Sequence, residues 1–193
     1  MALYAMGDLH LSLNSNKSME VFGPAWENYT ERIRASLSQL TAEDVLVLAG
    51  DTSWGMSLEE SAEDFRFLEQ FPCKKYLIKG NHDYWWTTAA KFYRFCEENG
   101  FPDLYLLNNN CYFYNGIALT GTRGWFFEED APDGSHNDKI FKRELLRLEA
   151  SLRAAGDTPE KLCFLHYPPL YQNYRCPEIL QLLHQFGVER CYY

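Results

Sequence analysis

Residues 45–51 read VLVLAGD, an unbroken apolar run that stops at Gly50 and is followed at once by Asp51. A continuous run of this kind predicts a short strand buried on both faces, as in the parallel sheets of α/β proteins. Glycine lets the chain turn sharply at that point, and the next side chain then stands at the strand end, where such sheets carry their ligand sites. The same succession of apolar run and polar side chain recurs elsewhere in the chain.

Other short apolar runs that end at a glycine or a polar residue also predict strands, and these lie at residues 3–6, 76–78 and 162–165. Between them, apolar residues spaced by three and four predict amphipathic helices. One helix is expected to start near Pro24 and to include Trp26, Tyr29, Ile33, Leu37 and Leu40. The others are marked by Phe65, Leu68 and Phe71, by Phe92, Phe95 and Cys96, by Phe141, Leu145, Leu148 and Leu152, and by Ile179, Leu183 and Phe186.

Residues 111–120 have a different pattern. Two short β-prone segments flank Asn115-Gly116, the dipeptide that most strongly indicates a two-residue hairpin. Strands and helices that alternate first and then give way to a hairpin predict an α/β fold whose sheet is parallel at first and antiparallel later. Because the chain contains no internal repeat and no Gly/Ser linker, we expect a single domain over residues 1–193.

Composition excludes several classes of function. The net charge of −9 argues against non-specific binding to DNA or RNA, which depends on clustered Lys and Arg, although a bound divalent cation could still attract a phosphorylated substrate. No apolar run approaches the roughly 18 residues of a membrane span. The 6 cysteines form no CxxC pair, and the N-terminus lacks a signal-peptide pattern. We therefore expect reduced thiols and a cytoplasmic protein.

Polar residues gather at the predicted strand ends, and these are Asp8 and His10, Asp51, Asn81, His82 and Asp83, and His166. Carboxylate and amide oxygens combined with imidazole nitrogens suit Mn, Fe, Zn or Co better than Ca. Two such ions about 3.5–4 Å apart can hold a phosphoryl group and produce a hydroxide nucleophile near neutral pH. Asp51, with candidate ligands before and after it, is the carboxylate expected to bridge both ions.

In this order, the residues resemble the calcineurin-like metallophosphoesterase family, whose pattern is D-x-H, GD, GNH with D or E, a single His, and GHxH. The first four blocks are present as Asp8-Leu9-His10, Gly50-Asp51, Gly80-Asn81-His82-Asp83 and His166. The resemblance extends over residues 3–193. It implies the fold of that family, an α/β arrangement of two mixed β-sheets sandwiched between helices.

The resemblance also implies a role for each matching residue. Asp8 and His10 would bind the first metal ion, Asp51 would bridge the two ions, and Asn81 and His166 would bind the second. His82 would lie beside the substrate, stabilise the phosphoryl charge together with Asn81, and protonate the leaving oxygen. The implied function is hydrolysis of phosphomonoesters or phosphodiesters by metal-bound hydroxide at a binuclear centre.

Arg123 is a further candidate for contact with the substrate, and it is suggested by its position in the sequence and not by the family pattern. It follows the second hairpin strand and could offer its guanidinium to a phosphate. The alternative is a surface arginine beside a packed Trp125. Four aromatic residues near the metal loops could either pack or stack on an organic group, and these are Trp54, Tyr84, Trp85 and Trp86. The acidic group of Glu59, Glu60, Glu63 and Asp64 is expected to be solvated.

Two departures from the family pattern leave alternatives open. Protein Ser/Thr phosphatases of the family extend GD to GDxxD, whereas Trp54 stands at that last position here, and the role of Asp83 stays open. The final GHxH is missing, and residues 188–193 resemble the strand that should lead into it. Either the sequence is incomplete at its C-terminus, or the protein is a non-catalytic binding or regulatory module.

Overall fold

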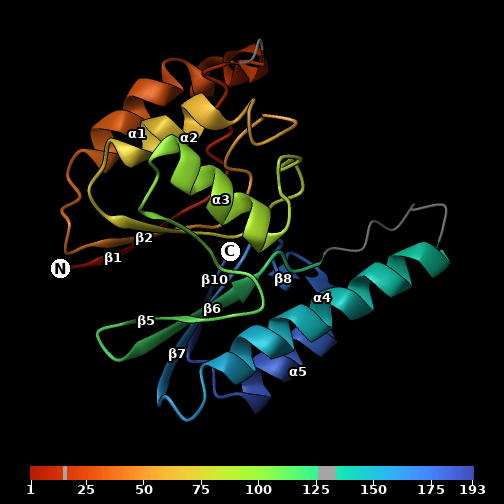
Figure 1. Cartoon of the computed structure of the whole chain (residues 1–193). Coiled ribbons are helices and arrows are strands. Elements are labelled where there is room, and N and C mark those ends of the chain that lie inside the picture. The colour runs from red at the N-terminus through yellow and green to blue at the C-terminus, as the bar shows by residue number, and fades with distance from the viewer. Residues whose placement is uncertain (15–16, 126–133) are drawn as a thin grey trace. The chain divides into compact units, whose positions relative to one another are not determined.

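A computed structural model describes residues 1–14, 17–125 and 134–193. The chain forms two compact units, Met1–Leu106 and Leu107–Tyr193 (Figure 1). Both are α/β, as the alternating apolar runs predict. That the two units make one domain stays a prediction.

The sheet of the first unit contains four parallel strands in chain order. They are β1 (Leu3–Met6), β2 (Val45–Leu48), β3 (Lys74–Leu77) and β4 (Leu104–Leu106). All four residues of β2 are buried, which confirms the strand predicted from the unbroken apolar run. β4 was not predicted, because three residues carry too little periodicity to stand out.

Three α-helices connect these strands: α1 (Tyr29–Leu37), α2 (Ala62–Glu69) and α3 (Ala89–Asn99). They lie on the same face of the sheet, where Figure 1 shows them above β1 and β2. Strands that follow one another in order, with right-handed crossovers, put every connecting helix on one face. The helices bury an aromatic core in which Phe65 and Phe92 contact each other and Trp85.

The helix expected from Pro24 onward is interrupted, so that prediction was wrong about its start. Pro24–Trp26 forms a separate 3₁₀ turn, and a second one lies at Met19–Phe22. Asn28 has a φ of 52° and lies in the left-handed region, which an α-helix cannot pass through. Apolar spacing alone did not reveal this break, because Trp26 and Tyr29 keep helical spacing across it.

The second unit has a mixed sheet with the strand order β10-β7-β6-β5. Its strands are β5 (Tyr112–Tyr114), β6 (Ile117–Thr122), β7 (Glu160–Leu165) and β10 (Arg190–Tyr192). β7 pairs in parallel with both β6 and β10, whereas β5 and β6 form the predicted antiparallel hairpin. Asn115 and Gly116 have φ values of 51° and 83°, as a type I′ turn requires.

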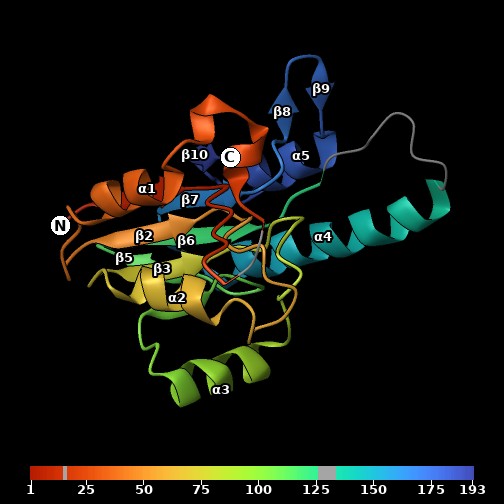
Figure 2. The ribbon, with the colours of Figure 1, turned by 90° about the horizontal axis from the view of Figure 1, so that it is seen from above.

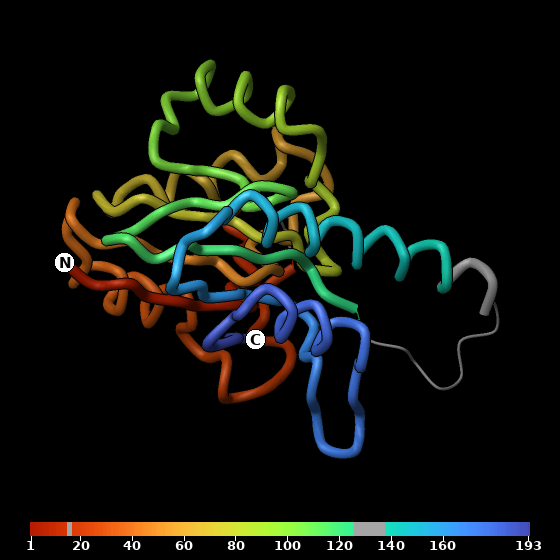
Figure 3. Tube along the Cα trace, turned by 90° about the horizontal axis from the view of Figure 1, so that it is seen from below, coloured from red at the N-terminus to blue at the C-terminus, as the bar shows by residue number. Residues whose placement is uncertain are grey.

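Two helices complete the second unit, α4 (Gly134–Ala154) and α5 (Pro177–Gln185). α4 packs against β6 and α5, and the buried cluster around them includes Leu148, Leu165 and Ile179. Figures 2 and 3 show a small hairpin that extends from this unit, made of β8 (Leu170–Tyr171) and β9 (Tyr174–Arg175). Within the described part of the chain, every helix is too short or too polar to cross a bilayer.

A buried carboxylate joins the start of β1 to the turn before β2. Asp44 accepts hydrogen bonds from the backbone N–H of Thr41 at 2.8 Å, from the Thr41 hydroxyl at 2.8 Å and from the N–H of Ala2 at 2.6 Å. The bonds from Thr41, with that from Ala2 in addition, lower the pKa of Asp44 to about 2.

Because this pKa lies below that of the unfolded chain, ionised Asp44 stabilises the fold above about pH 4, and the stabilisation is lost as the pH falls toward about 2. We predict that Asp44→Asn unfolds more easily than the wild type near neutral pH. The difference should shrink as urea unfolding is repeated from about pH 6 down to about pH 3. An equal difference at every pH would contradict this assignment.

Candidate metal centre

The loops that follow β1 and β2 lie side by side at the carboxyl ends of the strands. The backbone N–H of Asp8 donates to the carbonyl of Gly50 at 3.0 Å, and the backbone N–H of His10 donates to the carbonyl of Asp51 at 2.8 Å. An isolated bridge between Leu11 and Ser53 continues the pairing. The loops are thus held in register beyond the sheet, and the candidate ligands of both are fixed relative to one another.

Three candidate ligands in these loops have a strained backbone. Asp8, His10 and Asp51 have φ values of 54°, 44° and 52°, in the left-handed region that side chains with a Cβ rarely adopt. Each such residue costs about 1–3 kcal/mol, and strain of this kind is concentrated at functional sites. The conformation therefore supports a function for these loops beyond connecting strands to helices.

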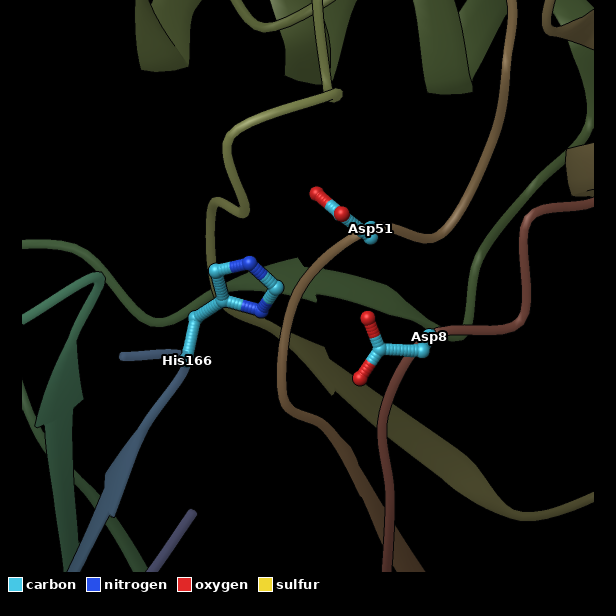
Figure 4. Close-up of side chains that lie close together, drawn as sticks. All are labelled: Asp8, Asp51 and His166. Carbon is cyan, nitrogen blue, oxygen red and sulfur yellow. The ribbon is translucent and has the colours of Figure 1, made fainter. Parts of the chain in front are cut away.

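The three side chains converge on one point of the first unit. His10 Nε2 lies 3.5 Å from Asp8 Oδ1 and 3.6 Å from Asp51 Oδ2, and carboxylate oxygens of the two aspartates lie within 4.8 Å of each other. Figure 4 shows both carboxylates reaching out from their loops. Ligands that share one ion with bonds of about 2.0–2.2 Å lie roughly 3–3.5 Å apart, so these donors fit a divalent metal ion.

The site has a buried side and an open side. The side chains of Asp51 and His10 are 3% and 10% exposed, whereas that of Asp8 is 62% exposed. A metal ion held here would be shielded on one side and reachable from solvent on the other.

The loop after β3 contributes the next candidates. The backbone N–H of His82 donates to Asp51 Oδ1 at 2.8 Å, so one oxygen of Asp51 faces this loop while the other faces His10. Asn81 lies half-buried in the same loop. Gly80 stands so close that an added Cβ would lie 2.3 Å from the backbone nitrogen of Asp51. Only glycine permits this approach.

Asp83, whose role was left open, is the residue that joins the two loops. Its carboxylate is fully buried and accepts hydrogen bonds at 2.7–3.4 Å from the backbone N–H groups of Asp51, Thr52, Ser53 and Gly80 and from the indole N–H of Trp85. Burial raises the pKa of Asp83, and the N–H bonds from Gly80 and Thr52 oppose that rise. It is therefore a structural residue of the site.

Asp64 was expected to be solvated, but its side chain is buried beside the loops that follow β1 and β2, so that prediction was wrong. It accepts hydrogen bonds from the Ser53 hydroxyl at 2.5 Å and from the N–H of Leu13 at 2.8 Å. Burial raises its pKa, and the hydrogen bonds from Ser53 and Leu13 oppose the shift. The residue lies on the buried face of α2, which spacing among acidic neighbours did not reveal.

The other candidates belong to the second unit. His166 directly follows β7, and its side chain is also drawn in Figure 4. The N–H groups of His166 and Tyr167 donate to the carbonyl of Arg123 at 3.1 and 2.7 Å. The side chain of Arg123 is 18% exposed, lies 3.9 Å from Glu144 and is centred 5.2 Å from the Trp125 ring. It is not a surface arginine, and its contact with phosphate stays a prediction.

The sequence model of the family described as calcineurin-like phosphoesterase matches residues 1–192. The chain belongs to the calcineurin-like phosphoesterase family. This confirms the resemblance inferred from the four motif blocks. Proteins of this family are hydrolases that act on phosphoester bonds and generally use divalent metal ions.

Two solved structures are similar to this chain. The chain is similar to a protein of Thermus thermophilus, with 14% identity over 98% of this chain and 79% of that one and a TM-score of 0.54. It is also similar to a protein of unknown function from Aquifex aeolicus, with 15% identity, coverage of 100% and 89%, and a TM-score of 0.47. At 14% identity, the similarity to the Thermus thermophilus protein supports the fold and nothing further. Among curated proteins, none matches this sequence.

The network around Asp83 predicts a large effect of a small change. In Asp83→Asn an amide nitrogen would replace one carboxylate oxygen, so buried donors such as the N–H groups of Asp51 and Gly80 would lose their acceptor. At about 1–3 kcal/mol for each donor, we expect the free energy of unfolding to fall by about 2–6 kcal/mol in urea titrations. Asp157→Asn makes the same chemical change at an exposed position and should change the free energy of unfolding by no more than about 0.5 kcal/mol. A loss in Asp83→Asn no larger than that in Asp157→Asn would contradict the role.

The close approach of Gly80 gives a second prediction with a matched control. Gly80→Ala should displace the loop of Asp51, lower the free energy of unfolding by about 1–3 kcal/mol and weaken Mn²⁺ binding measured by calorimetry. Gly7→Ala changes the equivalent glycine before Asp8, where the nearest atom to a new Cβ is that of Ala49 at 3.6 Å. It should behave like the wild type, and equal behaviour of the two variants would show that the approach is not required.

Proposed function

We propose that this protein hydrolyses phosphomonoesters or phosphodiesters at a centre of two divalent metal ions. One observation carries the proposal: His10 Nε2 lies 3.5–3.6 Å from oxygens of both Asp8 and Asp51. All three residues stand on strained loops at strand ends, in a chain of the calcineurin-like phosphoesterase family. Phosphoester hydrolysis is the reaction that accounts for both facts.

The proposed ligands follow the motif blocks. Asp8 and His10 would hold the first ion, Asp51 would bridge both ions, and Asn81 and His166 would hold the second. This mixture of oxygen and imidazole donors suits Mn, Fe, Zn or Co. When bound, the ions would supply positive charge against the phosphoryl oxygens and lower the pKa of water.

His82 is the proposed general acid. As the bond between phosphorus and the leaving oxygen breaks, the imidazolium would give its proton to that oxygen. Two contacts support this placement: the backbone N–H of His82 donates to Asp51, and the His82 ring centre lies 5.7 Å from that of His10. We further propose that Asn81, His82 and Arg123 contact the phosphoryl group, with Arg123 offering its guanidinium.

The proposed substrate is a phosphorylated small molecule or a phosphodiester, and not a long nucleic acid. The net charge of −9 supports this choice, since it would repel a long polyanion. We also propose a cytoplasmic location. All 6 cysteines are free thiols, as expected in a reducing compartment.

The test is hydrolysis of aryl phosphomonoesters and aryl phosphodiesters by Mn²⁺-loaded protein, with metal content measured in parallel. We expect metal-dependent turnover. Asp51→Asn should lose both bound metal and activity, because a bridging ligand is changed. His82→Ala should keep its metal but lose activity by a factor of about 10²–10⁴, the usual effect of removing a general acid.

Two exposed residues supply matched controls, since Asp157→Asn and His184→Ala make the same chemical changes away from the site. Both should match the wild type. Unchanged rates in Asp51→Asn and His82→Ala would sink the proposal. A protein that binds Mn²⁺ yet turns over no phosphoester would instead support the non-catalytic module.

A further inference from the structure

The imidazole rings of His10 and His82 are held without a hydrogen bond to Nδ1. In both residues this atom is buried, and no polar atom among the described residues pairs with it. A metal-binding histidine ordinarily donates its second N–H to a carbonyl or carboxylate, which fixes the plane of the ring. Here the planes must be fixed in another way.

Trp54 lies against both rings. Its ring centre is 4.9 Å from that of His10, with 25° between the planes, so the two are stacked. It is 4.6 Å from the ring of His82, at an angle of 49°. Both separations fall at the short end of the range of about 4.5–7 Å over which aromatic rings attract one another. One indole thus contacts the two histidines of the first unit's site.

Trp54 is itself anchored by groups other than the two imidazoles. Its backbone N–H donates to the carbonyl of Leu11 at 2.9 Å, and its Nε1 lies 3.3 Å from the sulfur of Met19. The ring of His10 is further confined by the edge of Trp26, whose centre is 6.3 Å away at 72°. Rotation of either imidazole would therefore require the indole to move.

We propose that Trp54 is a positioning residue: its indole fixes the ring planes of His10 and His82 by direct contact, in place of hydrogen bonds to Nδ1. For His10 this directs Nε2 at Asp8 and Asp51. For His82 it directs the ring that would protonate the leaving oxygen, and that part rests on the proposed function. Ring contact fixes a plane without selecting a tautomer, whereas a hydrogen bond to one nitrogen fixes both.

The first test uses metal-free wild-type protein with isotope-labelled histidine, observed by NMR. The ring current of a stacked indole should shift the carbon-bound ring protons of His10 and His82 upfield of those of exposed His184. The upfield shift should be much smaller in Trp54→Leu than in the wild type, and Trp54→Phe should give a value between the two. Unshifted signals in the wild type would overturn the proposal without any variant, so a failure of Trp54→Leu to fold does not leave the question unanswered.

The second test measures Mn²⁺ affinity by calorimetry together with kcat and KM on an aryl phosphoester. Trp54→Leu should weaken Mn²⁺ binding by about 10–100-fold, the usual effect of losing a group that orients a metal ligand, and should lower kcat more than it changes KM. Trp54→Phe, which keeps an aromatic ring, should restore most of both.

Trp86→Leu is the matched control, because Trp86 packs on Trp85 and is not among the rings that lie against His10 or His82 in the described part of the chain. A folded Trp54→Leu variant with the Mn²⁺ affinity and kcat of Trp86→Leu would overturn the positioning role. If the wild type hydrolyses no phosphoester, the proposed function fails, while the NMR shifts and Mn²⁺ affinities still decide the role of Trp54.

Discussion

The buried carboxylate of Asp83 is the group on which the rest of the site depends. Its two oxygens accept backbone N–H groups from the loop after β2 and from its own loop after β3. Hydrogen bonds to a charged group contribute about 1.5–3 kcal/mol each, and together they offset part of the cost of removing this carboxylate from water. Without this acceptor, several N–H groups at the buried side of the site would have no partner, and the two loops would separate.

That attachment also explains how strained residues persist. Asp51 can keep a φ of 52° because its N–H is bound by Asp83, its carbonyl by His10 and its side chain by the N–H of His82. Each bond would be lost if the residue relaxed to an ordinary conformation. The surroundings therefore hold Asp51 in its strained conformation, in which Oδ2 lies 3.6 Å from His10 Nε2.

Much of the fold and part of the site could be predicted from the sequence, because they depend on local signals. The apolar run at 45–49 and the turn at Asn115-Gly116 carry their structure within a few residues, and residues that end neighbouring parallel strands must lie near one another. The left-handed Asn28 and the short β4 left no such pattern. The role of Asp83 could not be foreseen either, since its carboxylate accepts from donors some 30 residues away, such as Thr52. Contacts of that kind depend on tertiary structure and have no periodicity.

The uneven exposure of the first unit's site follows from the same arrangement. Asp51 and His10 are buried because Asp83, Trp54 and the neighbouring loops enclose them, whereas Asp8 lies in the loop after the edge strand β1 and its side chain is exposed. Electrostatic interactions are stronger on the enclosed side, where the effective dielectric is lower. Hydrolysis needs both conditions, since phosphoryl charge is best stabilised where water is excluded and the second reactant is water itself. A site enclosed on all sides would exclude the water that reacts, and a site open on all sides would weaken the electrostatic stabilisation of the phosphoryl charge.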